Sequence, residues 1–189
     1  MSFFRIESRK YSSWLFIAIG LSLVAVVSTS AIAYVKNTSN PSASIPNDVV
    51  IDKVLVIKSE RVLKLLSDDN VIKTYHIALG SNSIGHKQQE GDGRTPVGDY
   101  LLDYKNESSI AHRSIHVSYP NVTDTARAKA LGVSPGGDIM IHGQMNGFGH
   151  LAWFNQKRDW TEGCIAVTND EMDEIMAAVE IGTVIEIIE

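Results

Sequence analysis

One cysteine and one histidine, each beside a glycine, are the side chains of this sequence best suited to covalent chemistry. Cys164 is the only cysteine in the chain and directly follows Gly163, in the stretch DWTEGCIAV. His142 ends the stretch IMIH and directly precedes Gly143. A cysteine nucleophile needs a base that accepts its proton and donors that stabilise an oxyanion. Together these residues predict nucleophilic attack on a carbonyl group, with His142 as the base.

A single thiol and a strand histidine also have explanations that involve no catalysis. An unpaired cysteine can be an inert buried residue or an intermolecular link as well as a reactive thiol. A histidine on a strand is commonly a packing residue, and the chain has 6 histidines. The glycine before Cys164 favours catalysis, because the missing Cβ lets a substrate carbonyl approach closely. It also lets the amides of Gly163 and Cys164 turn towards an oxyanion.

Two short strands are expected to carry the base and the nucleophile. In the stretch GGDIMIHG, Ile139 and Ile141 share one face, which leaves His142 on the other. Cys164 opens the next apolar stretch, CIAV, 22 residues after the histidine. If these strands are neighbours joined by a long excursion, their ends lie side by side. The sequence therefore predicts that the fold brings the two residues together.

Aromatic side chains are concentrated in the excursion between these strands. Trp153, Phe154 and Trp160 all fall within it. Aromatic residues in a loop over a cleft can bind glycan or peptide, or they can pack the loop against the domain. Both roles are open at this point, and Trp160 is the candidate nearest to the cysteine.

The remaining pattern predicts a strand-rich domain. One helix is expected to begin after Thr123, and a second after Thr168, whose spacing to Glu171 matches a capping box. With seven or so strands, this predicts an α+β domain in which two helices pack on a mostly antiparallel sheet or sandwich. The other strands are expected at residues 49–58, 61–66, 71–80, 97–104, 114–119 and 182–188.

The N-terminal part of the chain predicts export. Residues 11–35 are uncharged and apolar enough to cross a membrane as a helix. Residues 1–10 carry three basic side chains and are expected to remain in the cytoplasm. Small residues around Ala33 leave a cleaved signal peptide open as the alternative to a transmembrane anchor. The domain is thus expected at the outer face of the inner membrane, or in the periplasm or cell wall.

Residues 36–48 have the polar, proline-containing composition of a linker, and residues 49–189 form the expected catalytic domain. Of the 17 Lys and Arg and 22 Asp and Glu in the chain, three bases and one acid precede residue 36, so the exported part has 14 against 21. This net charge of −7 argues against a nucleic-acid partner. No Cys-x-x-Cys pair is present, and no metal and no cofactor are expected.

Three stretches carry a resemblance to a known family. IHG, then TEGCIAVTNDE, resembles the YkuD-type L,D-transpeptidase catalytic domain, whose hallmark is His-Gly followed roughly twenty residues later by Ser/Thr-x-Gly-Cys. The upstream GDGRTPVGDY is similar to that family's Thr-Pro-x-Gly-x-aromatic segment. The resemblance covers about residues 49–189. It implies the family's β-rich fold and a role in cell-wall biogenesis and cell shape, with peptidoglycan stem peptides as partners.

The resemblance also implies roles for particular residues. Cys164 is the nucleophile, His142 the base, Gly143 the residue whose carbonyl orients the histidine, and Gly163 the oxyanion turn. Thr161 takes the Ser/Thr position of the motif. The implied reaction releases D-Ala from a tetrapeptide stem, leaves a thioester on the cysteine and transfers the acyl group to an amine. The alternatives are an L,D-carboxypeptidase or amide hydrolase with the same site, or a non-catalytic cell-wall binding domain. No arginine follows the cysteine, which argues against a sortase-like protein.

Two positions depart from the family pattern. Glu162 stands where many members have histidine, and Ala166 where many have an arginine suited to a substrate carboxylate. Arg94 or Arg158 could replace that arginine, and His86 could line the cleft. A glutamate beside the nucleophile can raise the pKa of the thiol, pair with a substrate ammonium, or be a solvated loop acid with no role in the reaction.

Overall fold

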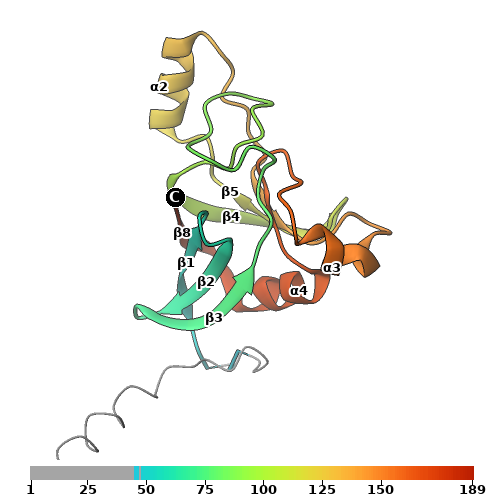
Figure 1. The fold of residues 1–189 in the computed structure, drawn as a ribbon. Coiled ribbons are helices and arrows are strands. Elements are labelled where there is room, and N and C mark those ends of the chain that lie inside the picture. The colour runs from blue at the N-terminus through green and yellow to red at the C-terminus, as the bar shows by residue number, and fades with distance from the viewer. Residues whose placement is uncertain (1–44, 47) are drawn as a thin grey trace, which may run out of the picture. The chain divides into compact units, whose positions relative to one another are not determined.

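The computed structural model describes residues 45, 46 and 48–189, which form one curled, mixed sheet with the helix of residues 169–178 packed against it (Figure 1). Eight strands pair in the order β3-β2-β1-β8-β4-β5-β6-β7. The predicted anchor and most of the predicted linker lie outside the described residues. Within the described range, no helix is long and apolar enough to span a membrane.

The first half of the sheet is built from two hairpins and the C-terminal strand. β1 (Ile51–Ile57), β2 (Val62–Ser67) and β3 (Asn70–His76) pair antiparallel in succession. β8 (Val179–Ile188) pairs parallel with β1 and antiparallel with β4 (Gly98–Ser109). The last strand of the chain therefore lies in the middle of the sheet.

The second half of the sheet carries the residues singled out for chemistry. β5 (His112–Val117) pairs antiparallel with β4 and with β6 (Met140–His142). β7 (Ile165–Ala166) then pairs parallel with β6. The prediction of a β-rich, mostly antiparallel α+β fold is confirmed, with β1–β8 and β6–β7 as the parallel pairs.

The helices are more numerous than expected. The predicted capping box is confirmed at α4 (Asn169–Ala178), where Thr168 and Glu171 cap each other. The predicted cap at Thr123 is wrong: α2 (Val122–Leu131) is capped by Asn121, whose side chain accepts from the Asp124 amide in a reciprocal capping box. A short 3₁₀ turn, Gly149–Leu151, and α3 (Ala152–Asn155) were not predicted.

One hydrophobic core holds the sheet against α4. Alternate strand residues point into this core, as the period of two of a β-strand requires. The α4 face that covers it presents Met172, Ile175 and Met176, all buried. Fully buried side chains on the strands include Val54, Leu63, Leu65, Leu102, Ile115, Ile141, Ile165, Ile185 and Ile187. The core fixes β6 and β7, and with them the ends of the strands that carry the base and the nucleophile.

Candidate active site

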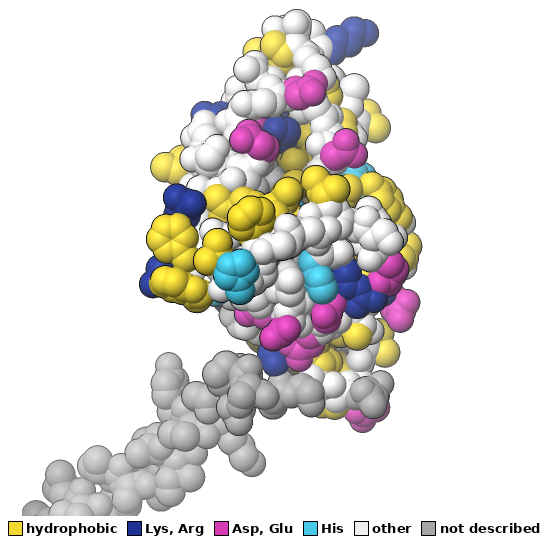
Figure 2. Space-filling model, turned by 90° about the vertical axis from the view of Figure 1, so that its right-hand side faces the viewer, with side chains coloured by type: hydrophobic (Ala, Val, Ile, Leu, Met, Phe, Trp, Pro, Cys, Tyr) yellow, Lys and Arg dark blue, Asp and Glu magenta, His cyan; other side chains and the backbone are white. Residues whose placement is uncertain are grey.

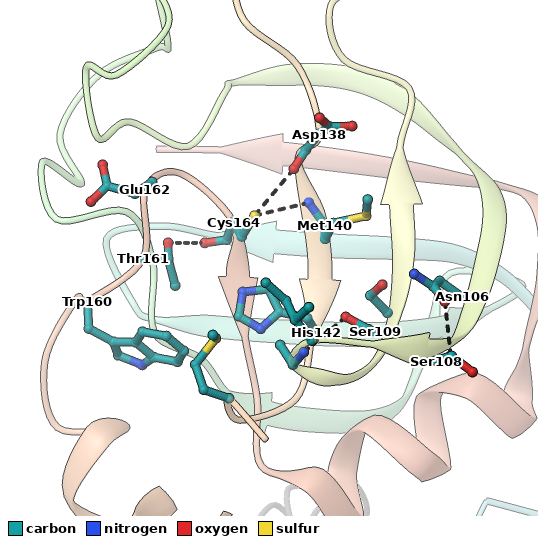
Figure 3. Close-up of a pocket in the computed structure, with 14 residues that line it drawn as sticks. Asn106, Ser108, Ser109, Asp138, Met140, His142, Trp160, Thr161, Glu162 and Cys164 are labelled. Carbon is teal, nitrogen blue, oxygen red and sulfur yellow. Dashed lines mark hydrogen bonds between the residues drawn. The ribbon is translucent and has the colours of Figure 1, made fainter. Parts of the chain in front are cut away.

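The parallel pairing of β6 and β7 brings Cys164 close to His142. Ile141 pairs with Ile165 and His142 with Ala166, so the cysteine directly precedes the strand that neighbours the histidine. The Met140 amide donates to the sulfur at 3.4 Å, and the sulfur lies 3.5 Å from the Asp138 carbonyl oxygen. Figure 3 shows the sulfur and the imidazole lining the same pocket. The predicted juxtaposition of the two strand ends is present.

The tautomer of His142 suits a general base. Its Nδ1 lies 2.6 Å from the carbonyl oxygen of Gly143. A carbonyl oxygen only accepts, so Nδ1 carries the proton and Nε2 keeps a free lone pair. The ring is buried and meets the indole of Trp160 edge-on, with 5.7 Å between ring centroids. The imidazole is therefore held in one orientation with its accepting nitrogen available.

Burial keeps both reacting groups uncharged at rest. It lowers the pKa of His142, an effect that the Gly143 carbonyl only partly opposes. Burial also raises the pKa of Cys164; the Met140 amide and the charge of Lys87 act to lower this pKa, and the charge of Asp138 acts to raise it. Both shifts favour the uncharged forms of the pair, a thiol and a neutral imidazole.

The turn before the nucleophile is braced by Thr161. This buried side chain donates to the Cys164 carbonyl at 2.7 Å and accepts from the Gly163 amide at 3.2 Å. Gly163 has φ +128°, and a Cβ there would lie 2.6 Å from the Arg94 carbonyl oxygen, so only glycine fits. Because the Gly163 amide is engaged by the threonine, the Cys164 amide is the donor of this turn that remains for an oxyanion.

The segment after β3 also contacts the residues on both sides of the turn at Gly163. The predicted strand 71–80 ends at His76, but Ala78 still bridges to Ala166 and Gly80 to Thr161. The Leu79 amide donates to the carboxylate of Asp159 at 3.0 Å. These contacts tie both sides of the nucleophile turn to a segment far away in the sequence.

Sequence reasoning missed the role of Asp159. Besides the Leu79 amide, its carboxylate binds the guanidinium of Arg61, with Nη2 to Oδ2 at 2.7 Å. Its partners are 80 and 98 residues away in the chain, so no local spacing signals the contact. Burial acts to raise the pKa of Asp159, but hydrogen bonds from Arg61, the Leu79 amide and Ser83 outweigh it and hold this pKa below its usual range.

Asp159→Asn is expected to lower the free energy of unfolding at pH 7 by about 1–3 kcal/mol, because it leaves Arg61 without its half-buried counter-ion. A lowered carboxylate pKa stabilises the fold at neutral pH, and this contribution is lost as the pH falls below about 4. Thermal unfolding of the wild type and Asp159→Asn should therefore differ at pH 7, and the difference should narrow as the pH falls from 4 towards 3. Asp48→Asn, an exposed acid at the edge of the domain, is the control. A constant difference across this pH range would contradict the prediction.

A cavity of about 480 Å³ opens above the thiol. Its apolar side includes Met145 and Trp160, and its polar side includes hydroxyl groups from the β4–β5 hairpin (Figure 3). Asp138 and Glu162 are its charged residues, and no lysine or arginine lines it. The full lining is Asn106, Ser108, Ser109, Ile110, Ala111, Ser114, Asp138, Met140, His142, Met145, Trp160, Thr161, Glu162 and Cys164. Within the described part of the chain, no group of three His, Cys, Asp or Glu side chains could hold a metal ion.

The predicted basic residues lie away from this cavity. Arg158 is exposed, with its guanidinium 5.0 Å from the ring centroid of Phe154. Arg94 lines a different hollow, together with Asp92. His86 accepts from the Val97 amide at 3.0 Å and contacts α2 through Asp124 and Arg127. Many family members have an arginine at the position of Ala166, which is fully buried in this chain. Neither Arg94 nor Arg158 replaces that arginine in the lining of the cavity.

The aromatic residues of the excursion divide into two groups. Trp160 packs on His142 and lines the cavity. Trp153 and Phe154 are 66% and 47% exposed and are covered on one face by Lys157 and Arg158 respectively. Figure 2 shows hydrophobic side chains gathered with basic ones on the face that carries α3. Of these aromatic side chains, Trp160 is the one positioned to contact a substrate.

Comparison with known proteins identifies relatives of this chain. The family model for the L,D-transpeptidase catalytic domain (YkuD) matches residues 50–187. YafK of Escherichia coli (strain K12), a presumed L,D-transpeptidase, is 28% identical over 129 residues, which cover 65% of this chain and 44% of YafK.

Solved structures agree with the fold. The helical cell shape determining protein Pgp2 from Campylobacter jejuni superposes with a TM-score of 0.57 at 28% identity, over 75% of this chain and 49% of Pgp2. Bd1075 of Bdellovibrio bacteriovorus has a TM-score of 0.52 at 21% identity, over 79% of this chain and 52% of Bd1075, and supports the fold alone. The chain spans about half the length of these relatives.

Proposed function

Because the chain belongs to the L,D-transpeptidase catalytic domain (YkuD) family, we propose that it is a cysteine acyltransferase acting on tetrapeptide stems of peptidoglycan. One observation carries the proposal: His142 keeps its Nε2 unprotonated through the Gly143 carbonyl, beside the thiol of Cys164 in an open cavity.

The first half of the reaction forms a thioester. The Cys164 sulfur attacks the carbonyl carbon of the bond between the L-centre and D-Ala, and its proton passes to Nε2 of His142. In this proposal the Cys164 amide donates to the oxyanion. The imidazolium then gives the proton to the leaving nitrogen, the carbon–nitrogen bond breaks, and D-Ala departs with its amine restored.

The second half returns the enzyme to its starting state. An acceptor amine attacks the thioester and gives one proton to His142, which passes it to the departing sulfur. The products are a new amide and the free thiol, so no redox step and no cofactor is needed. Water as acceptor would give a carboxylate instead, and the enzyme would then be an L,D-carboxypeptidase or amide hydrolase.

We also propose that the domain works outside the cytoplasmic membrane. The support is the uncharged segment 11–35 with basic residues before it. Residues 11–35 would act as an anchor, or be removed by cleavage near Ala33. Protease added to cells that express the chain, with the outer membrane permeabilised and the cytoplasmic membrane intact, tests this placement. A domain that is protected from the protease in these cells would overturn it.

Intact-protein mass spectrometry tests the reaction. The full chain is mixed with a purified disaccharide-tetrapeptide, with Cys164→Ala as the control. An adduct equal to the donor minus D-Ala, absent from the variant, is expected, and an added amine should convert it to a cross-linked product. Hydrolysis despite excess amine would instead establish the hydrolase. If no adduct forms and His142→Ala leaves alkylation of the thiol unchanged, the result contradicts the catalytic proposal and favours a cell-wall binding module.

A further inference from the structure

The base is oriented through the peptide group that follows Gly143. Nδ1 of His142 donates to the carbonyl oxygen of Gly143 at 2.6 Å. The N–H of the same peptide group belongs to Gln144, and it donates to Oδ1 of Asn169 at 2.8 Å. This peptide bond is trans and planar, so its carbonyl and its N–H point in opposite directions. Holding the N–H against Asn169 therefore aims the carbonyl at the imidazole.

Asn169 is the first residue of α4, and the start of this helix holds its side chain in place. The capping box of Thr168 and Glu171 fixes the first turn of the helix. Two glycines leave space for the amide of Asn169. A Cβ at Gly143 would lie 2.8 Å from its Oδ1, and a Cβ at Gly149 would lie 2.7 Å from its Nδ2. The segment after the base is thus packed closely around this side chain.

The side chain of Gln144 holds the same peptide group in position. This side chain is fully buried, and both of its polar atoms have partners. Its Nε2 donates to the Val167 carbonyl at 2.7 Å, and its Oε1 accepts from Nδ2 of Asn155 at 3.0 Å. A buried amide with paired polar atoms is costly to move, because each lost hydrogen bond leaves an unsatisfied group. Gln144 therefore fixes the residue whose N–H contacts Asn169.

We propose that Asn169 is a positioning residue, which sets the tautomer and the orientation of His142 through the peptide group between Gly143 and Gln144. The tautomer of an imidazole is set by the hydrogen bonds that its two nitrogens make. If the carbonyl turned away from Nδ1, the proton would no longer be held there. An imidazole with its proton on Nε2 has no acceptor for the proton of Cys164. The inference rests on the proposed function, to which it adds the residue that prepares the base.

Two substitutions at Asn169 test the role of its acceptor oxygen. Asn169→Leu has a similar shape but no acceptor, and it should slow formation of the acyl-enzyme by about 10²-fold. Asn169→Asp keeps an acceptor in the first turn of α4, where a carboxylate is favourable, and it should restore about the wild-type rate. Asn70→Leu, at an exposed position at the start of β3, is the control for the leucine. Equal rates for the leucine and aspartate variants would overturn the proposal.

A second measurement does not depend on catalysis. ¹⁵N NMR of the full chain with labelled histidine reports which imidazole nitrogen carries the proton, and His142→Ala identifies the signals of this residue. In the wild type, Nδ1 should be protonated and Nε2 unprotonated; Asn169→Leu should mix the two tautomers, and Asn169→Asp should not. If the wild type forms no adduct, the proposed function fails, and the tautomer still decides the role of Asn169. A tautomer that Asn169→Leu leaves unchanged would contradict that role.

Discussion

His142→Ala is expected to slow formation of the acyl-enzyme by about 10³-fold, and Cys164→Ala to abolish it. The thiol is held neutral by burial, so attack requires a base in contact with the reacting groups. His142 is the proposed base, because its Nδ1 is bonded to the Gly143 carbonyl and its Nε2 is left to accept a proton. Rates of adduct formation with the tetrapeptide, measured by intact mass, give the comparison.

A matched control separates this catalytic effect from the general loss of a histidine. His150 is exposed, lies in the same excursion and does not line the cavity, so His150→Ala should retain the wild-type rate. Thermal unfolding of both variants checks that each is folded. A His142→Ala protein that keeps more than about a tenth of the wild-type rate would remove the histidine from the mechanism.

Gly80→Ala is expected to destabilise the domain by about 2–3 kcal/mol and to abolish acylation. A Cβ at this buried position would overlap the Gly93 carbonyl oxygen and would lie 2.9 Å from the Cα of Gly163. The neighbouring atoms are backbone, so they cannot move aside as the end of a side chain would. The nucleophile turn must shift, and the alignment of Cys164 with His142 shifts with it.

Gly137→Ala provides the control for this substitution. No heavy atom lies within 4 Å of a Cβ placed at Gly137, and its φ is not positive, so the methyl group is tolerated. For a domain of this size, the Gly80 variant should unfold roughly 5–10 °C below the wild type, and the Gly137 variant close to it. Equal melting temperatures for the two variants would show that the segment after β3 does not constrain the nucleophile turn.

Local patterns predicted the parts of the fold that local contacts determine. Thr168 and Glu171 cap α4 through bonds between residues three apart, and their spacing alone is enough to find the helix start. The prediction at α2 was wrong by two residues because Asn121 and Thr123 both favour an N-cap. Only Asn121 has an acid three positions later, Asp124, which completes the reciprocal box.

Long-range contacts account for what the sequence did not predict. The pairing of Asp159 with Arg61 crosses 98 residues, and nothing near either residue signals the other. The sequence did not predict the position of Arg94 either. Its backbone carbonyl lies next to Gly163, but its side chain lines the separate hollow that also contains Asp92. The brief α3 escaped prediction because four residues without a capping side chain carry no helical period.

The order of the strands has a consequence for the timing of assembly. β8 lies between β1 and β4, so it is the strand that joins the two halves of the sheet. As the chain emerges from the ribosome, β1 to β3 and β4 to β7 are available before their common neighbour. A nascent chain that already contains both His142 and Cys164 therefore lacks the strand that holds the halves in register. The two halves that carry His142 and Cys164 can therefore be held in register only after the polypeptide has been made through Ile188.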